Sequence, residues 1–390
     1  MRGAGQKDCG LACPAKARRC GGCPLLELPY EEQLRQKQQF VERLLGRFAP
    51  VEPILGMEEP LHYRNKVIAT FAAVRGKLDC GIYEESSHRV VPVRNCLLQD
   101  SRLNEVAEAV LLAARRCRLT AYDEDRGSGL LRHMVLRRGV RTGQVSVTLV
   151  TPTSFFPGSR NFVRLLTAQC PDVVTVVQNI NPRHTSAVLG SAEKLLYGKG
   201  YLEDLLCGKR FAIAPRAFYQ INPVQTERLY NTALSFAGLT GKERVIDAYC
   251  GIGTIALAAS DHAAAVLGVE LNADAVKSAR RNAARNHAGN AAFLCGDAGA
   301  LMRQMAQEGE KADLVFFDPP REGASREFLD ALIRLSPRRV VYISCNPETQ
   351  ARDLAQLTSG GYRAERIQPV DLFPHTRHVE TIVLLQRETL

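Results

Sequence analysis

The sequence predicts an α/β protein with a doubly wound, mostly parallel sheet in its C-terminal part. Three observations support this. From residue 240 onward, strand-like runs alternate with helix-like runs, which is typical of a parallel sheet covered by helices. Between about 55 and 210, short β-rich runs alternate with turns, so we expect a β-rich middle. The first 23 residues carry four cysteines, Cys9, Cys13, Cys20 and Cys23, which indicates a separate N-terminal segment.

The length of 390 residues suits two or three domains, and 45% hydrophobic with 24% charged residues excludes a disordered or fibrous chain. No apolar run approaches the roughly 18–20 residues of a membrane span, and residues 1–22 lack the apolar core of an export signal. We therefore expect a soluble, cytoplasmic protein. The net charge of +10 suits a polyanion such as nucleic acid, although an indifferent basic surface is equally compatible with it.

The N-terminal half contains a predicted amphipathic helix at 30–49 and predicted strands that include 66–71, 144–150 and 173–178. Two stretches, 62–66 and 131–138, place basic residues beside aromatic or strand positions. Such a surface can bind RNA, or it can be a solvated strand face.

The C-terminal elements follow in a regular order. A strand is predicted to end at Asp247. It is followed by a helix at 254–260, a strand at 265–270 and a helix at 272–287 that Asn272 caps. Two strands at 291–295 and 313–318 come next. After these come a helix from about 325, a strand at 339–344, a helix from 347 and a final hairpin of 367–373 with 379–385.

The cysteine segment predicts a metal site. Two glycines inside Cys20-Gly-Gly-Cys23 allow both thiolates to face one centre, and four sulfur ligands suit zinc or an iron–sulfur cluster. Either Cys9 and Cys13 complete a local site, or Cys13 joins the pair with the distant Cys96. A disordered, redox-sensitive tail is the alternative.

A cofactor site is predicted at the strand-to-helix turn 247–254, where Gly251 and Gly253 allow close approach of a ligand. Glu270 ends the next strand, where a carboxylate can bind the ribose hydroxyls of NAD or S-adenosylmethionine. Asp247 would repel a pyrophosphate, and the rigid turn Asp318-Pro-Pro-Arg321 aims groups into the same cleft, so S-adenosylmethionine is favoured. The alternative is that these acids only cap helices.

A nucleophile and a base are predicted near this cofactor. Cys345 follows a strand and precedes a helix whose N-terminal amides can stabilise a thiolate. Glu380 begins the last strand among His375, Arg377 and His378, where it could act as a general base or form an ordinary ion pair.

Seven motifs in this order resemble the RNA uracil carbon-5 methyltransferases, a family that makes 5-methyluridine in ribosomal or transfer RNA. They are Cys13 with Cys20-Gly-Gly-Cys23, Tyr63-Arg-Asn-Lys66, Phe218-Tyr-Gln-Ile-Asn222, Asp247-Ala-Tyr-Cys-Gly-Ile-Gly253, Asp318-Pro-Pro-Arg321, Ser344-Cys-Asn-Pro347 and Phe373-Pro-His-Thr-Arg-His-Val-Glu380.

The resemblance implies an enzyme of class 2.1.1 with a Rossmann-like class I methyltransferase domain at 211–390. It further implies a β-rich RNA-binding domain at 51–210 and an iron–sulfur segment with a helix at 1–50. The implied catalytic residues are Cys345, which adds to uracil, and Glu380, the base. The implied cofactor residues for S-adenosylmethionine are Gln220, Tyr249, Thr254, Glu270, Asp297 and Asp318, and the implied ligands of a [4Fe–4S] cluster are Cys13, Cys20, Cys23 and Cys96.

Many members of that family begin with a β-barrel domain, for which the eight residues before Cys9 leave no room. The chain thus resembles a barrel-less subgroup, and we expect 23S ribosomal RNA as its substrate, with transfer RNA uridine as the alternative. Two rivals from other classes are an NAD-dependent dehydrogenase and a non-catalytic RNA-binding protein with a structural metal. No obligatory protein partner and no membrane contact are predicted.

Overall fold

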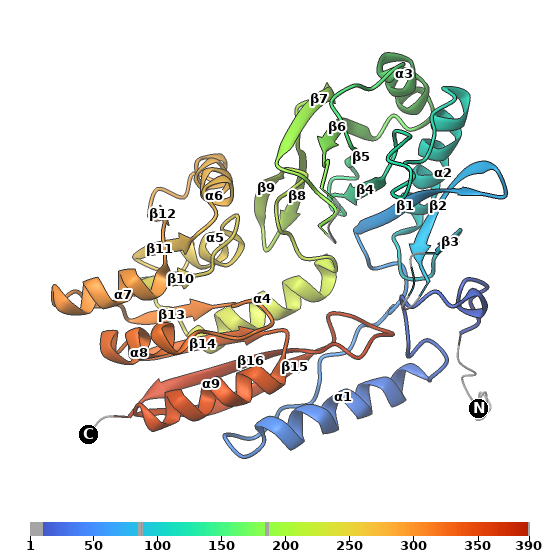
Figure 1. Cartoon of the computed structure of the whole chain (residues 1–390). Coiled ribbons are helices and arrows are strands. Elements are labelled where there is room, and N and C mark those ends of the chain that lie inside the picture. Colours follow the sequence, from blue (N-terminus) through green and yellow to red (C-terminus); the bar gives the residue numbers. More distant parts are fainter. Residues whose placement is uncertain (1–10, 85–86, 88, 184–186, 389–390) are drawn as a thin grey trace, which may run out of the picture.

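The computed structural model describes residues 11–84, 87, 89–183 and 187–388. This part of the chain contains two seven-stranded sheets and one two-stranded sheet (Figure 1). Cys9, one of the alternative metal ligands, lies outside the described residues. The rest of the cysteine segment contains the short 3-10 helix η1 (Lys16–Arg18) and leads into helix α1 (Tyr30–Leu45).

The first sheet occupies the middle of the chain. Its strand order is β3-β2-β1-β4-β5-β6-β7, and neighbouring strands are antiparallel except for the parallel pair β5 and β6. The strands are β1 (Lys66–Val74), β2 (Lys77–Tyr83), β3 (Val90–Pro92), β4 (His133–Arg138), β5 (Val145–Thr151), β6 (Val173–Ile180) and β7 (Ala192–Gly198).

Two helices that the sequence analysis did not predict pack on one face of this sheet. They are α2 (Ser101–Arg116) and α3 (Ser159–Gln169), whose apolar sides share a core with the inward residues of β1, β4 and β5. Asp100 caps α2, since its side chain accepts a hydrogen bond from the Arg102 amide. Buried Leu103, Val106 and Val110 follow with helical spacing, so α2 was detectable as an amphipathic helix.

The second sheet has the order β12-β11-β10-β13-β14-β16-β15, with β10 to β14 parallel and β16 antiparallel to both of its neighbours. The strands are β10 (Arg244–Ala248), β11 (Ala265–Glu270), β12 (Ala291–Cys295), β13 (Leu314–Phe317), β14 (Arg339–Ser344), β15 (Tyr362–Val370) and β16 (Glu380–Arg387). This arrangement confirms the predicted Rossmann-like α/β fold.

Helices cover both faces of this second sheet. One face packs against α4 (Pro223–Ala237), α5 (Thr254–Ser260) and α6 (Ala273–Arg285). The other face packs against α7 (Ala298–Gln307), α8 (Arg326–Leu335) and α9 (Pro347–Ser359), together with α1 from the N-terminal part. The central strands are buried on both sides, which explains their uninterrupted apolar sequences, such as 314–317 and 340–343.

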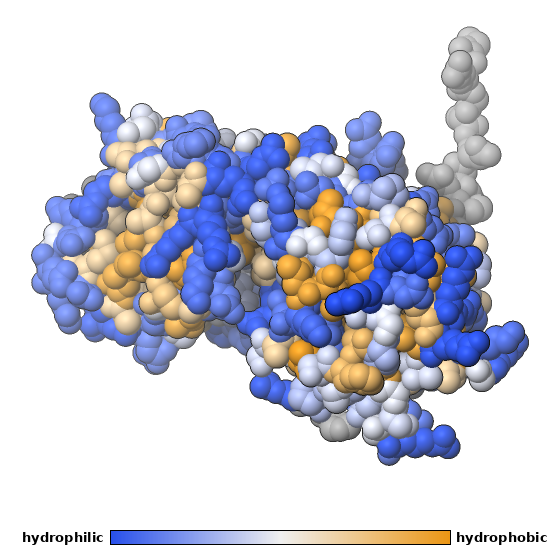
Figure 2. All heavy atoms as spheres, turned by 90° about the horizontal axis from the view of Figure 1, so that it is seen from above, coloured by the Kyte–Doolittle hydropathy of each residue, from blue (hydrophilic) through white to orange (hydrophobic). Residues whose placement is uncertain are grey.

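The parallel strands end on the side of the second sheet that faces the centre of the molecule, toward the first sheet (Figure 1). The small hairpin of β8 (Leu202–Leu206) and β9 (Lys209–Ile213) lies between the two large sheets in sequence, and a linker at 214–222 continues from it into α4. Viewed from above, the two lobes meet at a waist bordered by hydrophilic side chains (Figure 2). Side chains at the strand ends therefore lie near the junction of the lobes.

Candidate active site

The glycine-rich turn after β10 is held against the end of β11 by Glu270. One carboxylate oxygen of Glu270 accepts a hydrogen bond from the Gly251 amide at 3.2 Å and the other accepts from the Asn272 amide at 2.8 Å. Gly253 has a φ of 86°, and a Cβ atom there would lie 2.9 Å from the Phe293 ring. The turn therefore requires glycine at this position, and it brings the backbone at 251–253 beside the Glu270 carboxylate.

Asp247 lies buried beneath this turn with one oxygen unpaired. Its Oδ2 accepts a hydrogen bond from the Ala256 amide at 2.8 Å, whereas the buried Oδ1 has no partner. Burial, with smaller contributions from the nearby Asp318 and Glu270 carboxyl groups, raises the pKa of Asp247 to about 8. One oxygen thus caps α5, as the helix-capping alternative expected, and the other is available to a cationic or hydrogen-bonding ligand.

Three further predicted cofactor residues lie at the same edge, but their side chains already have protein partners. The Thr254 hydroxyl hydrogen-bonds the Tyr230 hydroxyl of α4 at 3.2 Å. Asp297 is the N-cap of α7 and accepts from the Ala300 amide at 2.7 Å. The Tyr249 ring packs on Phe328 with ring centres 5.3 Å apart, and burial raises its pKa to about 12. For Asp297, the structure gives the helix-capping role.

Gln220 lies on the linker before α4. Its side chain is buried, and its backbone carbonyl oxygen accepts a hydrogen bond from Asn65 Nδ2 at 3.2 Å. The Asn65 backbone amide also donates to the Ile221 carbonyl at 2.9 Å. Asn65 immediately precedes β1, so these contacts fasten the linker to the first sheet and hold Gln220 at the junction of the lobes.

Cys345 and Glu380 lie side by side at the ends of adjacent strands. Ser344 of β14 pairs with Thr381 of β16, which places the residue after Ser344 next to the residue before Thr381. Burial, with smaller contributions from Glu380 and Asp318, raises the pKa of the Cys345 thiol to about 11. The structure therefore brings the predicted nucleophile, the predicted base and one predicted cofactor residue together.

The carboxyl groups in this cluster favour their protonated forms. Glu380 is 2% exposed, and burial raises its pKa well above the usual value, with a further increase from Asp318 and a decrease from Arg321. Burial also raises the pKa of Asp318 to about 7. A carboxyl group with a raised pKa is suited to exchange a proton near neutral pH, which a general base requires.

Arg321 is a functional residue to which sequence reasoning gave no role of its own. Its side chain hydrogen-bonds the Cys345 sulfur and opposes the rise in that thiol's pKa. Its carbonyl oxygen accepts hydrogen bonds from Asn346 Nδ2 at 3.1 Å and from the Thr349 hydroxyl at 3.2 Å. Its place directly after Asp318-Pro-Pro was the available indication, since a turn so fixed delivers the next side chain to the cleft.

We expect Arg321→Met to raise the pKa of the Cys345 thiol, because the substitution removes the nearby positive charge and the hydrogen bond. Arg321 is solvent-exposed, so screening limits the effect to several-fold in thiolate fraction. The rate of iodoacetamide alkylation of the Cys345 peptide, followed by mass spectrometry at pH 8, should fall accordingly. Arg326→Met, on the exposed start of α8, is the control; equal rates in both variants would contradict this assignment.

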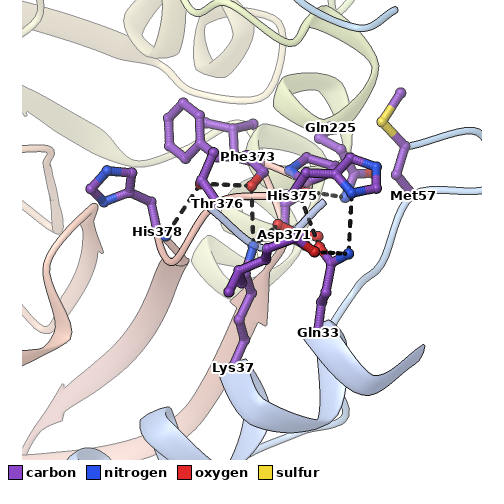
Figure 3. A network of polar contacts seen from close by, with 12 residues as sticks. Gln33, Lys37, Met57, Gln225, Asp371, Phe373, His375, Thr376 and His378 are labelled. Carbon is purple, nitrogen blue, oxygen red and sulfur yellow. Dashed lines mark hydrogen bonds and ion pairs between the residues drawn. The ribbon is translucent and has the colours of Figure 1, made fainter. Parts of the chain in front are cut away.

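The loop 371–379, which leads directly into Glu380 at the start of β16, is anchored on α1 (Figure 3). Lys37 Nζ donates to Asp371 Oδ1 at 2.6 Å and to the Phe373 carbonyl at 3.1 Å, and both charged side chains of the ion pair are buried. Gln33 bonds His375 twice, through the His375 amide at 2.9 Å and through Nδ1 at 3.1 Å. The loop therefore has a fixed conformation at the entrance to β16.

We expect Lys37→Met to lower the free energy of unfolding by about 3–5 kcal/mol, because it leaves the Asp371 carboxylate buried without its counter-ion. Chemical denaturation of the purified variant measures this change. The double variant Lys37→Met with Asp371→Leu should regain most of the loss. Arg366→Met, which breaks an exposed ion pair with Glu52, should cost less than about 1 kcal/mol. Equal costs for the buried and exposed pairs would contradict this expectation.

The cysteines Cys13, Cys20, Cys23 and Cys96 line one cavity of about 40 Å³. Burial raises the pKa of Cys20, and it raises that of Cys23 to about 11, in both cases with contributions from the neighbouring thiols. Among the described residues, no group of three or more His, Cys, Asp and Glu side chains is arranged to hold a single metal ion. The structure thus brings the four cysteines to one cavity, without arranging them as a site for a single ion.

No helix among the described residues is long and apolar enough to span a bilayer.

The chain is similar to known RNA methyltransferases over nearly its whole length. A protein of Halalkalibacterium halodurans described as an uncharacterized RNA methyltransferase is 41% identical over 379 residues, which cover 96% of this chain and 82% of that protein. One of Caldanaerobacter subterraneus with the same description is 42% identical over 375 residues, which cover 95% and 83%.

A solved structure supports the same relationship. The tRNA (uracil-54, C5)-methyltransferase of Pyrococcus abyssi, in complex with S-adenosyl-L-homocysteine, is 28% identical and covers 94% of this chain and 86% of that one, with a TM-score of 0.80. The family model described as tRNA (uracil-5-)-methyltransferase matches residues 188–388, about half of the chain. The resemblance inferred from the motifs is thereby confirmed. The chain belongs to the tRNA (uracil-5-)-methyltransferase family of RNA methyltransferases.

Proposed function

We propose that this protein methylates carbon-5 of a uridine in 23S ribosomal RNA, with S-adenosylmethionine as methyl donor and a covalent cysteine–uracil adduct as intermediate. The observation that carries the proposal is the placement of Cys345 beside Glu380 and Asp318 at the carboxyl ends of β13, β14 and the start of β16. One thiol and one proton-accepting carboxylate are the two groups that this chemistry needs.

The reaction requires both groups because carbon-5 of uracil is a poor nucleophile. Addition of the Cys345 thiolate to carbon-6 forms an enolate with electron density at carbon-5. S-adenosylmethionine, when bound, would supply an electrophilic methyl group to carbon-5, with cleavage of the bond between methyl and sulfur and release of S-adenosyl-L-homocysteine. Glu380 then removes the hydrogen of carbon-5, the bond between sulfur and carbon-6 breaks, and Cys345 leaves as a thiolate. The positive charge of Arg321 stabilises the Cys345 thiolate, both before it adds to the ring and after it leaves.

The donor would be held beside the glycine-rich turn by Gln220, Tyr249, Glu270 and Asp318. The unpaired Oδ1 of Asp247 supports a ligand with a positive charge or a hydrogen-bond donor at this place, since a buried carboxyl oxygen without a partner is costly. Thr254 and Asp297 are proposed contacts from family resemblance alone, because their side chains already bind Tyr230 and the start of α7.

We propose that Cys13, Cys20, Cys23 and Cys96 hold a [4Fe–4S] cluster. A [4Fe–4S] cluster takes four thiolate ligands, and these four cysteines line one cavity. Bound, the cluster would join residues 13–23 to Cys96 near the first sheet, and so supply folding energy to a segment with little apolar core.

The expected result for this site is a brown protein when it is purified without oxygen, with about four iron and four sulfide per chain. Cys23→Ala should lose the colour and most of the iron, because it removes one of four ligands. Cys117→Ala, at a cysteine outside the cavity, should keep both. A colourless wild type that contains zinc would contradict the cluster.

The RNA substrate is tested by mapping 5-methyluridine in 23S ribosomal RNA and in transfer RNA, from cells with and without the gene. Loss of one or more sites in 23S ribosomal RNA is the expected result. The second candidate is a transfer RNA uridine, and the description of the family and of the Pyrococcus abyssi relative favours it. Loss confined to the T loop of transfer RNA would establish that candidate. Either substrate implies a cytoplasmic location.

A further inference from the structure

Lys66 and Arg137 form a pair of like charges at the junction of the two lobes. They are direct cross-strand partners of β1 and β4, so their side chains leave the sheet on the same face. Arg137 is 3% exposed, and its Nη2 donates to the Ala217 carbonyl at 2.9 Å. Its Nη1 is buried without a hydrogen-bond partner, so the guanidinium is only partly satisfied.

This pair lacks the acidic partner that other buried cations of the protein have. Lys37 is paired with Asp371, Arg132 with Glu124 and Lys209 with Asp261. Within the described part of the chain, neither Lys66 nor Arg137 has a carboxylate within ion-pair distance. Burial, with a smaller contribution from Arg137, lowers the pKa of Lys66 to about 8, and burial lowers that of Arg137 to about 10. Two uncompensated cations in a partly dry site are costly, and an anion between them would remove this cost.

The surroundings of the pair connect it to the candidate active site. Arg137 bonds the linker at Ala217, and Asn65, directly before Lys66, bonds the same linker at Gln220 and Ile221. The Phe218 ring on this linker is 70% exposed. Lys66 is only partly buried, and Ile68, two residues along the same face of β1, is 42% exposed. A ligand can therefore reach the pair from this face.

We propose that Lys66 and Arg137 bind one phosphodiester of the RNA strand next to the target uridine. This inference rests on the proposed function, because it names how the substrate of that site is held. A phosphodiester offers two non-bridging oxygens to two cationic donors, and charge-assisted bonds of this kind position a nucleic acid without reading its sequence. The exposed Phe218 ring beside the pair offers a stacking surface, and the combination is typical of single-stranded nucleic-acid sites.

The carboxylate of the methyl donor is the other anion near this place, but the geometry favours RNA. Lys66 and Arg137 belong to the first sheet, whereas Glu270, Asp247 and Asp318 lie at the carboxyl edge of the second sheet. The pair and the residue before it are bonded to the linker that carries Gln220, through Arg137 and Asn65. A phosphodiester on the open face of β1 needs no movement of the linker.

The test compares RNA binding by Lys66→Met and Arg137→Met with the wild type, using an unmodified in vitro transcript of 23S ribosomal RNA and filter binding at several salt concentrations. Each variant should bind the RNA several-fold to about tenfold more weakly. The slope of log affinity against log salt concentration should become less steep by about one, which corresponds to the loss of one phosphate contact. Lys66→Arg should restore both values. Lys77→Met, at an exposed lysine on β2, is the matched control and should match the wild type.

Binding of S-adenosyl-L-homocysteine separates the outcomes. The increase in melting temperature that it causes should be equal in the wild type and in every variant, which also establishes that the variants fold. Unchanged RNA affinity and salt dependence in both Met variants would overturn the proposal. A loss of S-adenosyl-L-homocysteine binding with unchanged RNA affinity would also overturn it, because the anion bound by Lys66 and Arg137 would then be the carboxylate of the methyl donor. A wild type that binds RNA through this pair but forms no 5-methyluridine would refute the proposed function and leave the subsite standing.

Discussion

Cys345→Ala should abolish methyl transfer while the donor still binds. Without the sulfur no adduct forms at carbon-6, and carbon-5 lacks the electron density to attack the methyl group. Loss of a residue on which the chemistry depends lowers kcat by on the order of 10³-fold or more. Single-turnover transfer of radiolabelled methyl from S-adenosylmethionine to RNA measures this loss, and calorimetry with S-adenosyl-L-homocysteine should give a Kd like that of the wild type.

The control for this variant is Cys295→Ala, since Cys295 is exposed at the end of β12 and lies outside the cluster around Glu380. It should retain full activity. Methyl transfer by Cys345→Ala at more than a few per cent of the wild-type rate would mean that no covalent bond to this sulfur is required. The proposed mechanism would then be wrong, although the family assignment would stand.

Glu380→Gln should stop the reaction after methyl transfer and trap the protein on its RNA. The amide cannot accept the hydrogen of carbon-5, so the bond between sulfur and carbon-6 does not break. Loss of a general base costs about 10²- to 10⁴-fold in turnover. A denaturing gel should therefore show a protein–RNA band that carries the methyl label and that Cys345→Ala does not form.

Glu388→Gln changes an exposed glutamate beyond the end of β16 and should neither slow turnover nor accumulate the band. If Glu380→Gln turns over slowly without any adduct, even on RNA that contains 5-fluorouridine, another group removes the proton. Asp318 would then be the next residue to test, because its raised pKa also suits proton exchange near neutral pH.

The sequence predicted the second sheet more accurately than the first, for a physical reason. Strands 265–270, 291–295 and 339–344 were predicted with the bounds that the structure shows, because they are short apolar runs between polar turns and caps. The β15 strand begins at Tyr362, five residues earlier than predicted, since it lies at the sheet edge and alternates polar and apolar residues. The predicted helix at 30–49 ends at Leu45, where the chain turns at Gly46.

Helices α2, α3, α4 and α7 were not predicted, because each is a single helical segment between β-like runs, which dominate the local pattern. The residues of the candidate site also fall into two groups, those that the sequence could place and those that only the fold reveals. Cys345, Glu380 and Asp318 could be placed because each follows or begins a strand. The contact of Arg321 with Cys345 and the ion pair of Lys37 with Asp371 join residues far apart in the chain, and only the folded arrangement reveals them.

The Asp318 carboxyl group raises the pKa of both Asp247 and Glu380, and the pKa values of about 8 for Asp247 and about 7 for Asp318 allow these two groups to exchange protons near neutral pH. A sulfonium compound arriving beside them favours their ionised forms, so it expels protons and binds more tightly as the pH rises through 7 and 8. The demethylated by-product has an uncharged sulfur and loses that attraction. The acidic groups that favour binding of the methyl donor therefore also favour release of S-adenosyl-L-homocysteine, which limits inhibition by this product.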